Sequence, residues 1–420
     1  MPKTRIIAGI ELGSTKVATL IGQINSDPIS SETSINIIGA YTSPSAGVKK
    51  GQIVDIEAAV ESAISSVEAA ERMAGYNLES AYVSLGGAHI RSQNSHGVVA
   101  ISGQEGEITP GDIERAVEAA SAISLPTSRE VIHVLPRDYI VDGETGVKDP
   151  VGMSGVRLEV ETHIVSAATS AVKNVRKAVN EVGVQIEALI FSGFASAEAC
   201  VSATEKELGC VLVDIGGGTT SIAAFIDGAL AYSGVIPIGA RNITNDLAIG
   251  LRVSLETAEK IKIAISAKKQ KNKEESDEIN LDSLGVTEIK KISKKTLLEG
   301  IIRPRLNEIF TMVRLELEKE GISVRIPSGA VITGGGSETA GIIDSARRML
   351  SMPVRLGSPT GIGGLVDDVM NPAFSTVVGL LIYASKKEPV EHLSGMGRKI
   401  KLPNLGIFGK LVDTIKDLLP

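Results

Sequence analysis

Two short turns, one in each half of the 420-residue chain, constrain its fold more than any other feature. The first is Gly9-Ile10-Glu11-Leu12-Gly13-Ser14-Thr15-Lys16 and the second is Val213-Asp214-Ile215-Gly216-Gly217-Gly218-Thr219-Thr220. Each follows an apolar strand that ends in an acid, and each is followed by a returning strand. Because each half has one copy, the sequence predicts two related lobes, and this length agrees with two or more domains.

The residue types of these turns suit a magnesium-bound polyphosphate. Glycine lets a phosphate approach the backbone closely, and such a turn leaves backbone N–H groups free to face an anion. Glu11 and Asp214 would repel phosphate directly, but they suit a hydrated Mg²⁺, which keeps several waters and takes one or two carboxylates. Two turns that face each other would hold a triphosphate from both sides. The alternative is a pair of plain hairpins whose glycines take positive φ.

A third glycine cluster, Ile332-Thr333-Gly334-Gly335-Gly336-Ser337, is expected to end a strand and to open a helix over 337–350. A helix N-terminus reached through glycines is a ready ligand site, although it is also an ordinary strand-to-helix connection. The sequence contains no GxxxxGK[ST] motif, and none of the three clusters completes GxGxxG. P-loop and Rossmann nucleotide sites are therefore not expected.

The composition of the chain limits which binding partners and which cellular compartment we expect. The net charge of −7, the pI of about 5.5 and the lack of tryptophan argue against a nucleic-acid binder. Cys200, Cys210 and the five scattered histidines show no metal-binding spacing, and a reducing cytosol suits the thiols. No run reaches the roughly 18 apolar residues of a membrane span, and the start MPKTRIIAGIELG is typical of a strand rather than a secretory signal. We expect the body of the chain to be cytoplasmic.

The order of these motifs resembles that of the actin-like ATPases: two strand–turn units, a helix expected over 195–207 after Phe191-Ser192-Gly193, the GGGS turn and a last apolar helix at 372–384. Within that superfamily the chain resembles the FtsA family of bacterial cell-division proteins over nearly all of residues 5–384. The segments DPVGMSGVRL, VDIGGGTTSIAAF, VITGGGSE and STVVGLLIY carry the resemblance. It implies an α/β, actin-like two-lobed fold with an FtsA-type inserted subdomain.

The resemblance also implies domain boundaries. The first-lobe core would comprise 1–85, 166–192 and 356–384, with the inserted subdomain at 86–165. The second-lobe core would comprise 193–227 and 306–355, with its small subdomain at 228–305. A linker over 385–403 and an amphipathic helix over 404–420 would complete the chain.

Carried over by motif, the resemblance implies that ATP and Mg²⁺ bind between the lobes. The phosphates would lie at Glu11, Gly13, Ser14, Thr15 and Lys16 of the first turn and at Asp214, Gly216, Gly217, Gly218 and Thr219 of the second. Glu11 and Asp214 would hold Mg²⁺ through water. Adenosine would lie near Gly334, Gly335, Gly336 and Ser337, beside Glu259 and Lys262. Because Glu259 and Lys262 are three residues apart on a helix, a solvent-exposed ion pair is the alternative.

Hydrolysis is expected to be slow or absent. Actin-like enzymes that cleave ATP well place Gln or Glu just before the connecting helix, to orient water. Here Ser192 occupies the approximate position, and Glu198 follows farther along. A serine hydroxyl is a poor base, and general-base help is worth about 10²–10⁴-fold. We therefore expect ATP to act mainly as a conformational ligand.

The last segment, NLGIFGKLVDTIKDLL, predicts an amphipathic helix. Its apolar residues recur every three or four positions: Phe408, Leu411, Val412, Ile415, Leu418 and Leu419. Basic residues at 398, 399 and 401 favour an anionic membrane surface by about 1 kcal/mol each. Two Lys and two Asp balance the polar side, so one copy should bind weakly and reversibly, with self-association adding avidity. Docking on its own domain is the alternative.

The resemblance implies a filament-forming protein that tethers FtsZ to the inner face of the cell membrane at the division site, together with other division proteins. The FtsZ C-terminal peptide would meet Arg303 and Arg305, with Lys294 and Lys295 nearby; a solvated basic helix start is the alternative. Two rival functions remain: a PilM-type adaptor of pilus assembly, and an actin-fold chaperone or phosphotransferase. The amphipathic tail and the inserted subdomain argue against the first. The second would need a catalytic acid or base and a substrate domain.

Overall fold

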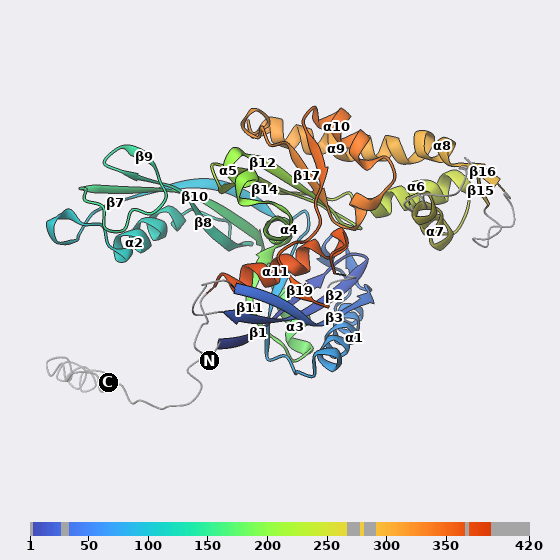
Figure 1. Ribbon diagram of the computed structural model, residues 1–420, viewed down its shortest axis with the longest axis horizontal. Helices are drawn as coiled ribbons and strands as arrows, with labels where there is room; N and C mark the ends of the chain where they lie inside the picture. The colour runs from blue at the N-terminus through green and yellow to red at the C-terminus, as the bar shows by residue number, and fades with distance from the viewer. Residues whose placement is uncertain (1–2, 27–32, 267–277, 281–290, 366–368, 388–420) are drawn as a thin grey trace, which may run out of the picture. The chain divides into compact units, whose positions relative to one another are not determined.

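The computed structural model describes residues 3–26, 33–266, 278–280, 291–365 and 369–387 (Figure 1). The chain divides into two compact units, Met1–Lys386 and Lys387–Pro420. The predicted tail helix with its apolar stripe, and all but the start of the predicted linker, therefore lie outside the described residues. Within the described part, no helix is long and apolar enough to cross a membrane.

A six-stranded sheet organises the first lobe. Its order is β11-β6-β1-β2-β3-β19, with antiparallel β1–β2 and β2–β3 pairs and with β6 and β11 parallel to β1. Helix α1 (Ile56–Ala74), capped by Asp55, packs on this sheet beside α3 (Thr169–Glu181). The strands are β1 (Lys3–Leu12), β2 (Lys16–Ser26), β3 (Thr33–Pro44), β6 (Ser80–Leu85), β11 (Gln185–Phe191) and β19 (Gly363–Gly364).

The sheet of the second lobe repeats this plan. Its order is β14-β13-β12-β17-β18, with antiparallel β12–β13 and β13–β14 pairs and with β17 and β18 parallel to β12. Five strands of each lobe thus share one order and one set of directions, so the prediction of two related lobes is confirmed. The strands are β12 (Cys210–Ile215), β13 (Thr220–Ile226), β14 (Ala229–Ile236), β17 (Ala330–Thr333) and β18 (Val354–Leu356).

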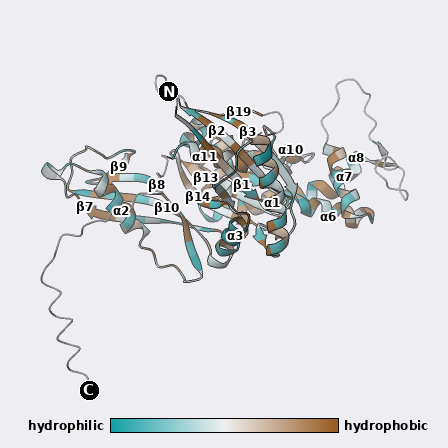
Figure 2. Cartoon of the chain, turned by 90° about the horizontal axis from the view of Figure 1, so that it is seen from below, coloured by the Kyte–Doolittle hydropathy of each residue, from teal (hydrophilic) through white to brown (hydrophobic). Residues whose placement is uncertain are grey.

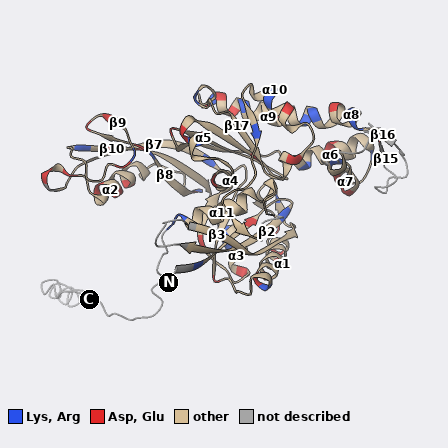
Figure 3. Cartoon of the chain, in the orientation of Figure 1, with Lys and Arg blue, Asp and Glu red and all other residues tan. Residues whose placement is uncertain are grey.

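Helices cover one face of the second sheet with a separate core, in which Ile243, Ile309 and Val313 are fully buried. The longest helical run of this lobe starts at Lys294, contains a π-helical turn at Leu298–Ile302 and ends at Lys319. In Figure 3 acidic and basic residues alternate along this run instead of forming a block of one sign. The elements are α6 (Ala240–Leu251), α7 (Leu255–Ser266), β15 (Glu278–Asn280), β16 (Lys291–Ser293), α8 (Lys294–Leu297), α9 (Arg303–Lys319) and α10 (Ile342–Leu350).

Two helices lie between the sheets. Helices α4 (Ser192–Cys200) and α11 (Ser375–Ser385) belong to a hydrophobic cluster that takes in β1, β2 and β6 on one side and β12 and β13 on the other. In Figure 2 the strongest brown lies on the central strands, whereas α1 carries both colours, as an amphipathic helix should. The helix expected over 195–207 is instead two, since α5 (Ala203–Leu208) starts anew behind its capping residue Ser202.

The inserted subdomain has a sheet and a core of its own. The sheet order is β7-β10-β8-β9, and α2 packs on β7 and β10 around Ile108, Leu158 and Val160. Strand β8 is one long strand, and its pairing with β10 contains register shifts. The elements are β7 (Arg91–Ala100), α2 (Pro110–Ser121), β8 (Arg129–Val141), β9 (Glu144–Val147) and β10 (Arg157–Ala168).

A buried polar cluster joins this subdomain to β14. His163 is fully buried, and its ring nitrogens bond the Asn94 side chain at 2.7 Å and the Ser233 hydroxyl at 3.0 Å. Burial lowers the pKa of His163 to about 3, so the ring is neutral. Ser92 adds bonds to both backbone groups of Ser233. The edge strand β14 is thereby covered rather than left open.

Helices α4 and α11 cross so closely that Gly379 has no room for a side chain. A Cβ at Gly379 would lie 1.7 Å from the carbonyl oxygen of Ala195. We expect Gly379→Ala to force the helices apart and to lower the free energy of unfolding by at least about 2 kcal/mol. Thermal or urea unfolding measures this. Gly300→Ala is the matched control: its Cβ meets nothing within 4 Å. Equal stability of the two variants would contradict the packing described.

Candidate functional site

The two turns at the ends of β1 and β12 have the same hydrogen bonding. The amide of Gly13 donates to the carbonyl of Lys16 at 3.0 Å, and that of Gly216 donates to Thr219 at 2.8 Å. Glu11 and Asp214 occupy matching positions, each on the strand just before its turn, opposite Ala18 and Ser221. The two turns, which are similar in sequence, therefore also have the same backbone geometry.

The turns face each other and are almost in contact. A Cβ at Gly217 would lie 1.9 Å from Oγ1 of Thr15, and one at Gly218 would lie 2.8 Å from Oγ of Ser14. None of the glycines of the two turns has positive φ. The alternative of plain hairpins with glycines at positive φ is therefore wrong. Gly217 and Gly218 are needed because a side chain there would collide with the first turn.

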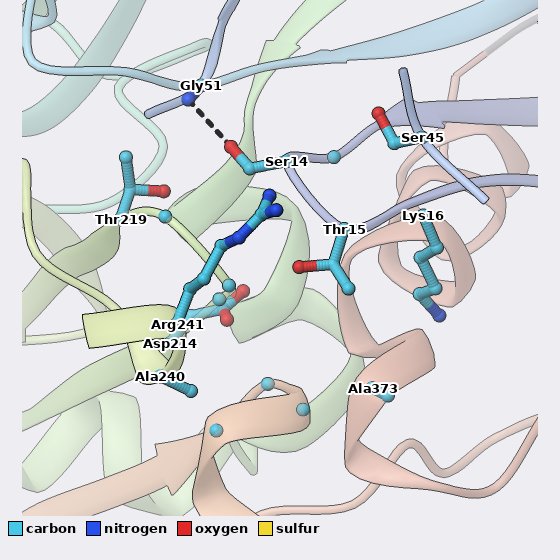
Figure 4. Close-up of a pocket in the computed structure, with 18 of the residues that line it drawn as sticks. Ser14, Thr15, Lys16, Ser45, Gly51, Asp214, Thr219, Ala240, Arg241 and Ala373 are labelled. Atoms are coloured by element: carbon cyan, nitrogen blue, oxygen red, sulfur yellow. Dashed lines mark hydrogen bonds between the residues drawn. The ribbon is translucent and has the colours of Figure 1, made fainter. Parts of the chain in front are cut away.

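Both turns line one cavity of about 690 Å³, a volume in the range of small-molecule sites (Figure 4). Of the residues predicted to bind the nucleotide and Mg²⁺, Ser337 is absent from the lining, although it is buried and directly follows Gly336. The predicted residues that the cavity brings together are Glu11, Gly13, Ser14, Thr15, Lys16, Asp214, Gly216, Gly217, Gly218, Thr219, Glu259, Lys262, Gly334, Gly335 and Gly336.

Three buried charges of the two turns influence one another. Burial raises the pKa of Glu11 to about 7. The negative charge of Asp214 adds to this rise, and the positive charge of Lys16 opposes it. Burial also lowers the pKa of Lys16, although both acids oppose this shift. The ammonium of Lys16 lies 3.6 Å from the ring centroid of Phe374, a cation–π contact.

Asp214 is tied to the helices between the sheets. Its Oδ2 accepts hydrogen bonds from Ser196 of α4 at 2.5 Å and from Thr376 of α11 at 3.1 Å, and these hydroxyls lie 2.9 Å apart. Burial raises the pKa of Asp214, while the two hydroxyls and Lys16 counteract it. Sequence reasoning missed Ser196 and Thr376, because their contact with Asp214 depends on the packing of two distant helices.

The donor set fits a magnesium-bound polyphosphate. Oε2 of Glu11 and Nζ of Lys16 are buried and form no hydrogen bond with any described residue, and buried polar groups normally have partners. A hydrated cation near the two acids and an anion near Lys16 would satisfy both groups. Among the described residues, no three His, Cys, Asp or Glu side chains are grouped to bind a metal, so a cation here would rely on waters and on its ligand.

The opposite side of the cavity has mixed polarity. Lys262 pairs with Glu259 at 2.8 Å and donates to the Thr244 hydroxyl at 3.0 Å. Lys262 is only 9% exposed, so the alternative of a solvent-exposed pair is wrong for the lysine. A polar face of the cavity is thus present on α6 and α7.

The GGGS turn differs from its predicted form. Gly335–Glu338 is a 3-10 helix, and the α-helix expected from 337 begins only at Ile342, because Gly341 has φ 79° and interrupts it. Gly334 lies so near Asp214 that a Cβ would be 2.2 Å from Oδ1. The turn therefore packs against the acid itself rather than offering an α-helix N-terminus.

The two residues considered for hydrolysis lie apart. Ser192 lines the cavity, and its hydroxyl bonds that of Ser221 at 3.1 Å. Glu198 does not line the cavity; it pairs with Lys206 at 2.6 Å and with Lys386. Burial alone would raise the pKa of Glu198, but the two lysines hold it below its usual value.

The predicted partner residues already have ion pairs. Arg303 pairs with Glu299 at 2.6 Å, and Arg305 pairs with Asp246 at 2.7 Å and with Glu308. Lys294 and Lys295 begin the helical run and Arg303 begins α9, so basic residues do lie at helix starts, whereas Arg305 lies inside α9. The partner role of Arg303 and Arg305 stays a prediction.

Sequence reasoning missed two further parts of the site. One is the hairpin of β4 (Val48–Lys49) and β5 (Gln52–Ile53), whose Gly51 amide donates to the Ser14 hydroxyl at 3.0 Å (Figure 4). The other is the start of α6, where Arg241 lines the cavity. A signal for the second existed, since Gly239 follows a strand and precedes a helix, like the glycines of the GGGS turn.

Comparison with known sequences identifies the family. A family model for the SHS2 domain inserted in FtsA matches residues 87–166, and one for cell division protein FtsA matches residues 211–379. The chain is 42% identical to cell division protein FtsA of Pseudomonas aeruginosa over 384 residues, 91% of this chain and 90% of the relative. The chain belongs to the FtsA family of cell-division proteins. The FtsA proteins of Borreliella burgdorferi and Escherichia coli are 36% and 35% identical, over 95% and 93% of this chain and 95% and 92% of the relatives.

Solved structures show that this chain has an actin-like fold. The PilM–PilN type IV pilus biogenesis complex aligns with a TM-score of 0.64 and 17% identity, over 91% of this chain and 99% of that one. MreB5 of Spiroplasma citri bound to ADP aligns with a TM-score of 0.52 and 15% identity, over 90% and 96%. At these identities the likeness shows the fold alone, so the PilM-type alternative gains nothing from it.

The raised pKa of Glu11 predicts a pH effect on stability. Since the pKa of about 7 in the folded chain exceeds the ordinary glutamate pKa of 4.5, the stabilising contribution of Glu11 is complete below pH 4.5 and is lost as the pH rises through 7. Glu11→Gln cannot ionise. In EDTA and without nucleotide, we expect the Tm of the variant relative to the parent chain to rise between pH 5 and 8. A Tm difference that stays constant over this range would contradict a buried Glu11 carboxyl.

Proposed function

We propose that this FtsA-family chain binds Mg²⁺-ATP between its lobes, polymerises, and tethers FtsZ to the cytoplasmic face of the cell membrane through its C-terminal segment. The observation that carries the nucleotide part is the meeting of two acid-tipped turns at one cavity. The family membership and the apolar stripe of the tail sequence support the cellular part.

The residues around the cavity suggest a division of roles. Backbone amides of the two turns would face the phosphates, and Lys16 would add a positive charge beneath them. Bound Mg²⁺ would supply charge that links the waters of Glu11 and Asp214 to phosphate oxygens. Glu259 and Lys262, positioned by Thr244, would meet the nucleoside, and Gly334–336 would allow it to approach closely.

Hydrolysis, if present, would be slow. Ser192 is the residue of the connecting helix that lines the cavity, and its hydroxyl already bonds Ser221. Glu198 is held by two lysines outside the cavity, so it is in no position to activate water at the phosphates. ATP would act mainly by holding the lobes in one arrangement.

The small subdomain at about 228–305 would bind FtsZ, and the C-terminal tail would bind the membrane. Arg303 and Arg305 would have to exchange Glu299, Asp246 and Glu308 for acidic groups of the FtsZ peptide. The same subdomain exposes apolar side chains that a peptide could cover, at Ile249, Leu255 and Ile263. Other division proteins would join through surfaces that these observations do not single out.

The proposal predicts that Asp214 makes ATP binding depend on magnesium. We expect Asp214→Asn to weaken ATP binding about 10–100-fold in Mg²⁺, because the variant loses a carboxylate near the cation. In EDTA the variant should bind ATP as well as the parent or better, since a charge that repels phosphate is gone. Titrations of nucleotide binding in the two buffers test this.

Glu198→Gln is the matched control for that experiment, because it removes another carboxylate whose side chain is only 7% exposed and which lies outside the cavity. Its ATP affinity should respond to Mg²⁺ as that of the parent chain does. If the parent chain binds ATP with the same affinity in Mg²⁺ and in EDTA, the roles proposed for Glu11 and Asp214 are contradicted. Failure of the parent chain to bind ATP at all would overturn the nucleotide part of the proposal.

Liposome co-sedimentation tests the tail. With ATP and anionic vesicles, we expect the full chain to pellet and a chain ending at Pro403 to remain in solution. Ile415→Asp, which places a charge on the apolar stripe, should abolish pelleting, whereas Thr414→Asp adds the same charge beside the stripe and should weaken it less. If the truncated chain pellets as fully as the intact one, the tail is not the anchor.

A further inference from the structure

Four basic side chains line the cavity, and three of them have a partner. Lys16 lies over the ring of Phe374, Lys260 pairs with Glu256 at 2.7 Å, and Lys262 pairs with Glu259 at 2.8 Å. The fourth is Arg241. Its guanidinium forms no ion pair or hydrogen bond with any residue that the structure describes, although five N–H donors are available.

The backbone of Arg241 is fixed to the second turn. At the start of α6, the amide of Ala240 donates to the carbonyl of Gly216 at 2.9 Å, and the amide of Arg241 donates to that of Gly217 at 2.8 Å. Gly239 permits this contact, since a Cβ there would lie 2.5 Å from the Gly216 oxygen. The side chain thus starts from a rigid position at the turn, although its end is free.

The side chain points into the cavity. In Figure 4 the guanidinium extends from α6 towards the region where Ser14, Thr15 and Thr219 lie, which belong to the two facing turns. Thr244, one turn further along α6, instead bonds Glu259 and Lys262 of α7. The guanidinium of Arg241 thus extends towards the two turns and forms no bond with the Glu259–Lys262 pair.

We propose that Arg241 binds the terminal phosphate of the nucleoside triphosphate and makes this site prefer triphosphate to diphosphate. This inference rests on the proposed nucleotide site. Arg241 is exposed, and its planar guanidinium can donate two parallel hydrogen bonds to phosphate oxygens. The diphosphate lacks the group that Arg241 would reach, so the arginine stabilises one bound state more than the other.

Arg241→Gln tests this inference, because it keeps a polar side chain and removes the charge. The dissociation constants of ADP and of a non-hydrolysable ATP analogue are measured in Mg²⁺. We expect the analogue to bind about 10–100-fold more weakly, as for the loss of charged hydrogen bonds, with ADP changed by less than about threefold. Arg241→Lys keeps the charge but cannot donate two parallel hydrogen bonds. Its affinity for the analogue should therefore lie between those of the parent chain and of Arg241→Gln.

Arg252→Gln is the matched control, since it removes the same side chain at the opposite end of α6, outside the cavity. It should leave both dissociation constants unchanged. The inference is overturned if Arg241→Gln weakens both nucleotides by the same factor, as a general electrostatic field would, or weakens neither. Failure of the parent chain to bind either nucleotide would instead refute the proposed function. Thermal unfolding verifies that each variant is folded.

Discussion

The crossing of α4 and α11 between the two sheets is the contact on which the rest of the structure depends. Its closest point joins Gly379 to the backbone of Ala195, with no space for a side chain. Residues from both sheets share the hydrophobic cluster around these helices, so the lobes are packed through one layer. Because dense packing transmits displacement, neither helix can move without the strands on both sides.

The same layer positions the chemistry of the cavity. Ser196 of α4 and Thr376 of α11 both donate to Asp214, which ends the first strand of the second lobe. Two residues further along α4, Glu198 pairs with Lys206 and with Lys386, which directly follows α11. Two carboxylates therefore connect the C-terminal half of α4 to α11 and its end. This explains why Glu198 is buried and charged although it has no place in the cavity.

The sequence revealed the local parts of the site and missed the parts made by distant contacts. The two turns were predictable because strand, acid and small residues are adjacent in the chain. Glu259 and Lys262 were predicted as site residues only from the family resemblance. The roles of Ser196 and Thr376 were not predictable, since an isolated hydroxyl in an apolar helix has no periodic signal. The predicted helix ends were wrong where a single residue sets the boundary. Gly341 delays the start of α10, and Ser202 caps a new helix, α5, in place of one continuous helix.

The site has an electrostatic cost that its ligand would remove. Burial disfavours the charged forms of Glu11 and Asp214, and it disfavours the charged form of Lys16 as well. Lys16 is one cation between two acids, so the acids are not fully compensated by the described residues. A divalent cation with a polyphosphate adds positive charge where the carboxylates are and negative charge where Lys16 and Arg241 are. Binding would then stabilise the ionised forms and the closed contact of the turns together, because any ligand that binds only the folded arrangement shifts the equilibrium towards it.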